Sequence, residues 1–163
     1  MTVLKIREFG DPGLKEKCHK IVVGKQNLNE LIKNMADTMY GAPGVGLSAP
    51  QVGILEQLFI YDVGDGLQVY INPKIVAVEG EDIDEEGCLS IPNIQVPVKR
   101  AKKVKISTLN AKGKNVTFVA DGLLARVIQH EIDHLNGILI LDKTDVANRR
   151  NALMELSKKI EID

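Results

Sequence analysis

The 163-residue sequence contains only two cysteines, Cys18 and Cys88, and no segment approaches the 18 apolar residues that could span a membrane. Its N-terminus, MTVLKIREFGDPGLK, also has no apolar run of signal-peptide length. We therefore expect a cytoplasmic protein, in which a reducing environment disfavours a disulfide between the two cysteines. Each cysteine is then either a small buried residue or a reactive or metal-binding thiolate.

The sequence also lacks a dominant charge. Its 21 Lys and Arg residues nearly balance 22 Asp and Glu residues, for a formal net charge of −1. This balance argues against broad attraction to nucleic acid or to anionic membranes, and we expect neither as a partner. No repeat, low-complexity segment or linker rich in Pro, Gly or Ser divides the chain. We expect residues 1–163 to form a single domain.

The spacing of apolar residues predicts three helices, over residues 27–40, 121–137 and 148–160. Asn27 is suited to cap the first helix and Gly41 to end it. Asp121 and Gly137 bound the second, which is the central helix of the predicted fold. The third is mostly amphipathic and closes the chain.

Strands are predicted over residues 58–63, 68–78, 104–110 and 114–120. Pro73 indicates an edge or a bend in the second, and Gly113 a turn that makes the last two a hairpin. Residues 41–53 are too rich in Gly and Pro for a regular element. The acidic run 79–87 predicts a solvated turn or strand edge, and the basic run 99–105 an exposed strand face.

Together these elements predict an α+β fold, with mostly antiparallel strands packed around the central helix. That helix carries QHEIDH at residues 129–134. At a spacing of four residues His130 and His134 project from one helix face, with Glu131 one step round. Two imidazoles beside a carboxylate indicate a metal site with its own proton acceptor. The third histidine, His19, has no such context and is predicted at the surface.

A catalytic site of the zinc type normally has three protein ligands, so the two histidines leave one ligand open. The extended metalloprotease pattern would place a third His at position 140, but that residue is Ile140. Glu155, on the last predicted helix, fits a second protease arrangement. Cys88 offers a thiolate, which is a strong ligand for first-row divalent metals. The residues alone do not decide whether Glu155 or Cys88 is the third ligand. The alternative for Cys88 is a buried cysteine that binds no metal.

Three separated segments together resemble the motifs of the peptide deformylases: GVGLSAPQ (44–51), EGCLS (86–90) and QHEIDH (129–134). The FGDPGLK opening and the ADGLLARVIQHEIDHLNG helix extend the resemblance over nearly the whole chain. It implies that Cys88, His130 and His134 bind the metal, and that Glu131 is the general acid and base. It also implies that Gln51 and the main-chain N–H of Leu89 bind the substrate carbonyl oxygen. The first motif commonly has Ala where this chain has Ser48, and the extra hydroxyl needs a partner.

The resemblance implies a metal-dependent hydrolase that removes the N-formyl group from the initiator methionine of nascent polypeptides and releases formate. It implies one divalent metal ion, natively Fe²⁺, with Zn²⁺, Ni²⁺ or Co²⁺ as alternatives in purified protein. Formylated nascent peptides are the expected partners. Family members that dock on the ribosome through a C-terminal helix suggest the same role for residues 148–160.

Helical geometry gives an expectation for specificity. Leu123 and Val127 fall on one stripe with His130 and His134, so we predict that they line a pocket for the methionine side chain. Simple core packing is the alternative for both. In the family the substrate backbone pairs like an added strand with the first two motifs, which implies roles for Val45, Gly46 and Gly87.

Two other functions are consistent with the same residues. One is a small metallopeptidase that uses Glu155 as its third ligand. The other is a non-catalytic module that binds a metal or a peptide.

Overall fold

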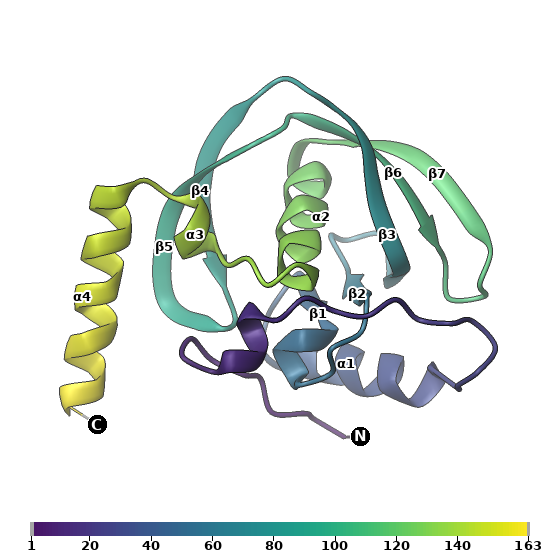
Figure 1. Ribbon diagram of the computed structural model, residues 1–163, viewed down its shortest axis with the longest axis horizontal. Helices are drawn as coiled ribbons and strands as arrows, with labels where there is room; N and C mark the ends of the chain where they lie inside the picture. The colour runs from purple at the N-terminus through teal and green to yellow at the C-terminus, as the bar shows by residue number, and fades with distance from the viewer. Residues whose placement is uncertain (1, 163) are drawn as a thin grey trace.

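The computed structural model describes residues 2–162, with side chains described through residue 159. Within these residues, two antiparallel sheets surround the central helix α2 (Gly122–Leu135), as Figure 1 shows. The larger sheet has the order β1-β2-β3-β6-β7, formed by Gly46–Ser48, Leu58–Tyr61, Gln68–Glu79, Lys103–Leu109 and Asn115–Asp121. The smaller sheet pairs β4 (Asp82–Cys88) with β5 (Ile91–Arg100). The predicted α+β class and the central helix are confirmed.

The other helical elements are η1 (Pro12–Lys15), α1 (Asn29–Gly41), η2 (Ala49–Val52), α3 (Ile140–Lys143) and α4 (Val146–Ile162). All three predicted helices are present, with ends shifted by one or two residues. The residue directly before α1 is Leu28 and not the predicted Asn27, but the side-chain oxygen of Asn27 accepts a hydrogen bond from the main-chain N–H of Asn29 at 2.9 Å. Asp121 stands at the start of α2, but its side chain makes no capping hydrogen bond. No helix in the described range 2–162 has the length and hydropathy to cross a bilayer.

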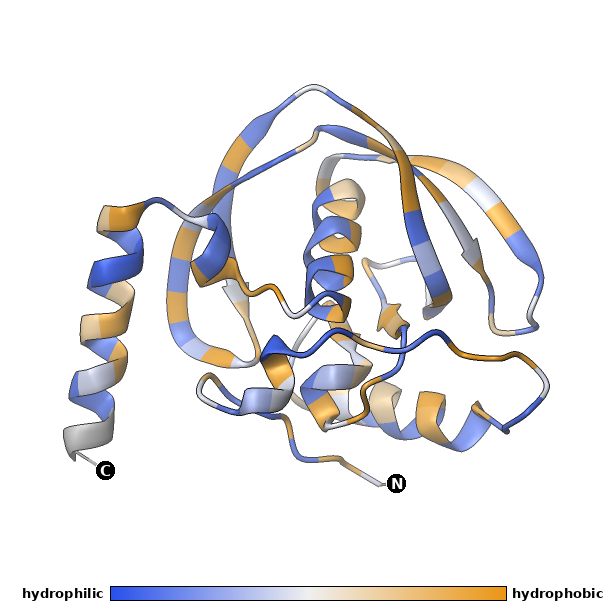
Figure 2. Cartoon of the chain, in the orientation of Figure 1, coloured by the Kyte–Doolittle hydropathy of each residue, from blue (hydrophilic) through white to orange (hydrophobic). Residues whose placement is uncertain are grey.

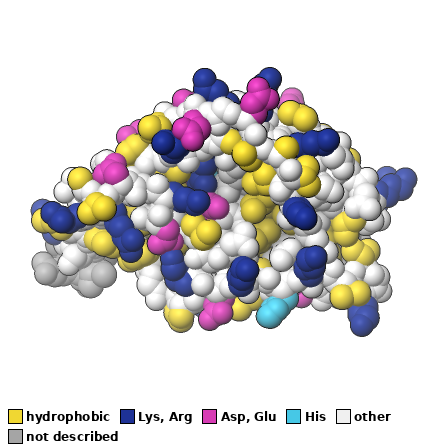
Figure 3. Space-filling model, turned by 45° about the horizontal axis from the view of Figure 1, so that its top comes forward, with side chains coloured by type: hydrophobic (Ala, Val, Ile, Leu, Met, Phe, Trp, Pro, Cys, Tyr) yellow, Lys and Arg dark blue, Asp and Glu magenta, His cyan; other side chains and the backbone are white. Residues whose placement is uncertain are grey.

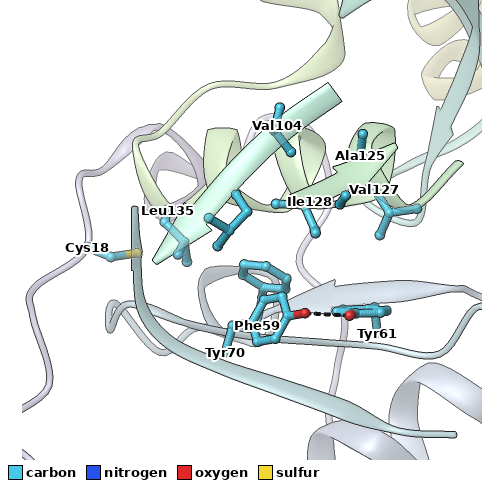
Figure 4. Packing of buried hydrophobic residues seen from close by; sticks show 11 residues of the cluster. Cys18, Phe59, Tyr61, Tyr70, Val104, Ala125, Val127, Ile128 and Leu135 are labelled. Atoms are coloured by element: carbon cyan, nitrogen blue, oxygen red, sulfur yellow. Dashed lines mark hydrogen bonds between the residues drawn. The ribbon is translucent and has the colours of Figure 1, made fainter. Parts of the chain in front are cut away.

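Helix α2 packs its apolar face on the larger sheet and forms one of the hydrophobic core clusters there. Ile128 and Leu135 are buried in one cluster with Phe59, Tyr61 and Tyr70 (Figure 4). Full burial of an aliphatic side chain contributes about 1.5–3 kcal/mol. The two tyrosine hydroxyls hydrogen-bond to each other at 2.5 Å, which satisfies both polar groups inside this core.

Alternation of hydrophobic and polar residues explains why the strands face as they do (Figure 2). In β6 the buried residues Val104 and Ile106 alternate with the exposed Lys103 and Lys105. β6 and β7 pair in register from Lys103–Asp121 to Leu109–Asn115, which confirms the predicted hairpin. Charged side chains of both signs are scattered over the face in Figure 3, consistent with the balanced composition.

The bend predicted at Pro73 is present in β3. The register of β3 against β6 shifts between Ile71 and Lys74, and Asn72 has a φ of 50°. The side-chain amide of Asn72 exchanges two hydrogen bonds of 2.8 Å with the main chain of Ile21. A proline cannot donate to a strand ladder, so the chain leaves regular pairing at this point.

One expectation for local structure was wrong, and one strand was missed. The Gly- and Pro-rich residues 41–53 contain the short strand β1 and the 3-10 helix η2. The acidic run 79–87 forms most of strand β4 in the two-stranded sheet, and most of its charges are exposed, which agrees with the predicted strand edge. Strand β5 was missed, because Pro92 and Pro97 interrupt its alternating pattern.

Residues 7–9 of the N-terminal segment hydrogen-bond to two of the motif segments, 44–51 and 86–90. The main-chain N–H of Arg7 donates to the carbonyl of Gln51 at 2.7 Å, and that of Phe9 donates to the carbonyl of Ser90 at 2.8 Å. Residues from the first and second motifs are thus held by one stretch of extended backbone. The side chains of Gln51 and Ser90 therefore start from fixed main-chain positions.

Gly137, just beyond α2, is tightly constrained, and Gly137→Ala should destabilise the fold by about 3–5 kcal/mol. Its φ is +74°, and an added Cβ would lie 2.4 Å from the carbonyl oxygen of Lys15. Gly24→Ala is the matched control, because Gly24 also has a positive φ (+92°) but no atom within 4 Å of its Cβ position. The control should cost only about 1–2 kcal/mol. Urea unfolding of both variants measures the difference, and equal losses would contradict the close approach.

Candidate metal centre

One cysteine sulfur and two imidazoles converge at the C-terminal end of β4. The Sγ atom of Cys88 lies 3.3 Å from Nε2 of His134, which lies 3.2 Å from Nε2 of His130. One ligand atom from each of the three residues falls within 4.8 Å of the others. Glu155 does not belong to this group; it is exposed on α4, which packs beside β5 (Figure 1).

A tight hairpin places Cys88 at this position. β4 ends at Cys88 and β5 begins at Ile91, so Leu89 and Ser90 form a two-residue turn between paired strands. The register shifts between Gly87 and Cys88, so three extra residues of β5 bulge out beside the turn. Such a bulge bends the end of the hairpin, which here reaches the histidines of α2.

Glu86 fixes the orientation of His130. Its Oε1 lies 2.9 Å from Nδ1 of His130. An ionised carboxylate can only accept, so Nδ1 carries a hydrogen, and Nε2 is the ring nitrogen that faces His134. This carboxylate–imidazole pairing is typical of histidines that bind metals.

Glu86 is itself held in a buried ionic network. It accepts hydrogen bonds from Arg100 at 2.9 and 3.0 Å and from Arg126 at 2.6 Å, and Arg100 also pairs with Asp133. Burial alone would raise the pKa of Glu86, but hydrogen bonds from His130 and Arg100 and their charges lower it to about 2. Glu86 therefore stays ionised. Glu86 and Arg100 are only 6% and 5% exposed, so the solvent exposure predicted for the acidic and basic runs is wrong at these two positions.

The three converging residues fit a divalent metal ion. Typical bond lengths at a tetrahedral zinc-type site would separate two nitrogens by about 3.3 Å and a sulfur from a nitrogen by about 3.6 Å. The observed separations, 3.2 and 3.3 Å, are close to these values. Burial lowers the pKa of His134 well below 6.5, which keeps its imidazole neutral, as a ligand must be. Burial opposes the charged form of His130, but Cys88 and Glu86 raise its pKa well above 6.5, so these neighbours favour a positive charge here.

The other cysteine and the third histidine lie outside this centre. Burial raises the pKa of Cys18 to about 11, with a further contribution from Glu56, so this thiol remains protonated. Its packing in the core matches the alternative of a small buried residue. His19 is exposed, as predicted.

Glu131 is a buried carboxylate next to the centre. It is 4% exposed, and burial raises its pKa to about 7. Its Oε1 has no hydrogen-bond partner among the residues whose side chains are described. A Cβ added to Gly46 would lie 2.6 Å from Oε2, so only glycine lets β1 pass this close to the carboxylate. A buried carboxyl group with a free oxygen can exchange a proton with a small bound molecule.

The side-chain amide of Gln51 faces the centre from η2. Its Nε2 donates to the Ser90 hydroxyl at 3.1 Å and lies 3.6 Å from Sγ of Cys88. Its Oε1 accepts from the main-chain N–H of Ser48 at 2.9 Å and from the Ser48 hydroxyl at 3.0 Å. The extra hydroxyl of Ser48 thus has a partner. The side chain of Leu89 packs against Gly44, where an added Cβ would lie 2.7 Å from it.

A cavity of about 830 Å³ opens beside these groups. Its lining includes all five residues predicted to contact substrate, namely Val45, Gly46, Gly87, Leu123 and Val127. Leu123 is 61% exposed, whereas Val127 is 7% exposed and also packs in the core cluster between α2 and the larger sheet. The lining of the cavity also includes Gln51, Cys88, Leu89, His130 and Glu131.

Sequence reasoning missed four residues that support the centre: Glu86, Ser90, Arg100 and Asp133. The burial of Arg100 could have been predicted from the sequence pattern, since Arg100 falls on the same alternating face of β5 as the buried Ile94, Val96 and Val98. Glu86 belongs to the EGCLS segment but was grouped with its exposed neighbours.

Comparison with known proteins gives consistent matches. The family model described as polypeptide deformylase matches residues 3–150. The peptide deformylase of Carboxydothermus hydrogenoformans is 52% identical over 145 residues, which cover 89% of this chain and 95% of that relative. The peptide deformylase of Clostridium botulinum is 51% identical over 144 residues, or 88% of this chain and 98% of that protein.

The fold is also similar to solved structures of peptide deformylases. The crystal structure of a peptide deformylase from Legionella pneumophila superposes with a TM-score of 0.92 at 38% identity, covering 99% of this chain and 97% of that one. That of a peptide deformylase from Synechococcus elongatus, in complex with actinonin, gives a TM-score of 0.89 at 41% identity, covering 93% and 85%.

The network around Glu86 predicts that Glu86→Gln weakens metal binding by about 10- to 100-fold. The amide keeps the shape but loses the charge that orients His130 and balances Arg100. Asp84→Asn is the matched control, since it removes one charge from an exposed position of the same strand. Competition with a chromophoric chelator measures the affinity, and circular dichroism verifies that both variants fold. Equal affinities for the two variants would refute the role of Glu86.

Proposed function

The chain belongs to the polypeptide deformylase family, and from this premise we propose which residues perform its reaction. The enzyme removes the N-formyl group from the N-terminal formylmethionine of nascent polypeptides and releases formate. We assign the metal ligands to Cys88, His130 and His134, and we treat residues 1–163 as a single catalytic domain. The observation that carries this assignment is the convergence of these three ligand atoms within 4.8 Å, beside the buried carboxylate of Glu131.

A divalent cation held by these residues would acidify water and polarise the formyl carbonyl. The chain contributes the geometry for this chemistry. Glu86 keeps His130 in the tautomer that presents Nε2, and the hairpin turn holds Cys88 opposite the two imidazoles.

Glu131 moves the proton. Its carboxylate lies beside the ligands, buried and with one free oxygen. In the proposed reaction it takes a proton from the attacking water and gives it to the amino nitrogen as the C–N bond breaks. Water supplies the hydroxyl group of formic acid, and the peptide leaves with a free amino terminus, so all atoms balance.

Gln51 and Leu89 stabilise the oxyanion. When water adds to the formyl carbon, its oxygen becomes negative and needs donors. Gln51 and Leu89 both line the cavity, and Nε2 of Gln51 lies 3.6 Å from Sγ of Cys88, so the proposed donors are Nε2 of Gln51 and the main-chain N–H of Leu89. Loss of one donor of this kind typically lowers turnover by about 10²–10³-fold.

The cavity walls bind the peptide. Val45, Gly46 and Gly87 lie along it and contact the substrate backbone, while Leu123 and Val127 contact the methionine side chain. An apolar pocket of this kind separates side chains by only about 1–3 kcal/mol per methylene, so close relatives of methionine should also be accepted.

We further propose Fe²⁺ as the native metal, with Zn²⁺, Ni²⁺ or Co²⁺ in purified protein, and the cytoplasm as the location. A thiolate with two imidazoles is compatible with each of these ions. Docking of α4 near the ribosomal exit tunnel stays a prediction: Arg149 and Arg150 are exposed on this helix, and cosedimentation with ribosomes would test it.

The decisive experiment is formate release from formyl-Met-Ala-Ser by metal-loaded protein. Wild-type enzyme should release formate, and Glu131→Ala should lose turnover by several orders of magnitude, about 10³-fold or more, while retaining its metal. Glu155→Ala is the matched control, since it removes a carboxylate outside the centre. Wild-type protein without formate release would favour a non-catalytic binding module, and near-normal turnover of Glu131→Ala would remove its assigned role.

Metal content separates deformylase ligation from the metallopeptidase alternative. Cys88→Ala should lose the metal and Glu155→Ala should keep it, because Cys88 lies with the two histidines and Glu155 does not. Elemental analysis of protein purified without oxygen should find about one metal per chain in the wild type, with iron as the main species. The opposite pattern in the two variants would establish Glu155 as the third ligand.

A further inference from the structure

Ser48 lies inside the site, at the position where the first motif departs from its usual alanine. It is fully buried, and its hydroxyl lies 3.0 Å from Oε1 of Gln51. The main-chain N–H of Ser48 donates to the same oxygen at 2.9 Å. An amide oxygen has two lone pairs, so the main chain and the hydroxyl of one residue can satisfy both.

These two bonds determine where the amide nitrogen points. The Nε2 group of Gln51 donates to the Ser90 hydroxyl at 3.1 Å and lies 3.6 Å from the Cys88 sulfur. A flipped amide would place its oxygen against that sulfur and its NH₂ against the main-chain N–H of Ser48, so two donors would meet. The amide is planar, so two anchors on its oxygen also fix the direction of its N–H groups.

We propose that Ser48 is a positioning residue for catalysis, acting through the amide of Gln51. The inference rests on the role proposed above for Gln51 in oxyanion stabilisation. The hydroxyl bond holds the amide plane and polarises it, which makes the N–H groups stronger donors. An alanine would keep the main-chain bond but leave one lone pair of a buried oxygen without its donor.

Charge on the formyl oxygen develops only as the transition state forms, so a better-aimed donor raises kcat more than it lowers KM. A serine that merely satisfied its own hydroxyl in the core would affect stability and not this ratio. The two roles therefore give different kinetic results.

Steady-state kinetics with formyl-Met-Ala-Ser test the proposal. Ser48→Ala should lower kcat by about 3- to 10-fold, the range expected for one neutral hydrogen bond, and leave KM within about 2-fold. Thr108→Val is the control, because Thr108 is also a buried hydroxyl but bonds the main chain of Ile71 outside the cavity. It should leave kcat unchanged.

A double-mutant cycle identifies the path of the effect. Gln51→Leu should lower kcat by about 10²–10³-fold, and adding Ser48→Ala to it should change nothing further. The same 3- to 10-fold loss in both backgrounds would overturn the proposal. If Ser48→Ala left kcat unchanged while Gln51→Leu lowered it, the proposal for Ser48 would also be overturned, but the proposed function would stand. Near-normal turnover of Gln51→Leu would instead remove the role of Gln51 and this inference with it.

A spectroscopic measurement tests the same contact without turnover. The side-chain amide resonances of Gln51 in zinc-loaded protein can be assigned by their loss in Gln51→Leu. Ser48→Ala should move the amide protons upfield, because the polarising bond is gone, while Thr108→Val should leave them in place. Unchanged resonances in Ser48→Ala would overturn the proposal.

Discussion

The carboxylate of Glu86 joins the β4–β5 hairpin to helix α2, and the arrangement of the proposed metal ligands depends on this junction. It receives hydrogen bonds from Arg100 on the hairpin and from Arg126 and His130 on the helix, all between 2.6 and 3.0 Å. Moving such charges out of water costs desolvation free energy. The attraction between the opposite charges offsets this cost only when every hydrogen-bond donor and acceptor is well placed. The network therefore contributes orientation more than net stability, since it holds the hairpin against the helix and places a hydrogen on Nδ1 of His130.

Helix α2 serves the core and the chemistry with one continuous surface. Ile128 and Leu135 pack on the sheet, while His130 and Glu131 face the cavity and Val127 borders both. The helix can approach β1 because Gly46 has no side chain where the Glu131 carboxylate lies. A site made this way is rigid, because its functional groups project from elements that the core already fixes.

Features that depend on short-range residue patterns could be predicted from the sequence. The central helix and the β6–β7 hairpin follow from short-range periodicity, and the motif spacing drew attention to Cys88, His130 and His134. Strand β5 was missed because its prolines interrupt the pattern. Glu86 could not be recognised as buried, because its charge is tolerated in the interior only through partners that include Arg100, 14 residues away. The main-chain N–H of Ser48 donates to the side chain of Gln51 three residues along, in the serine-to-glutamine spacing typical of a capping box, so that contact was within reach of sequence reasoning.

The hydrogen bonds from Arg7 and Phe9 to Gln51 and Ser90 have a consequence for how the enzyme comes into being. They join residues that are translated early to segments that are made later, and the proposed ligand His134 follows Cys88 by a further 46 residues. A nascent chain that stops before His134 cannot hold the complete centre. Each molecule of the enzyme must therefore be translated past this residue before it can begin work, whereas the chains it trims need to expose only their first few residues.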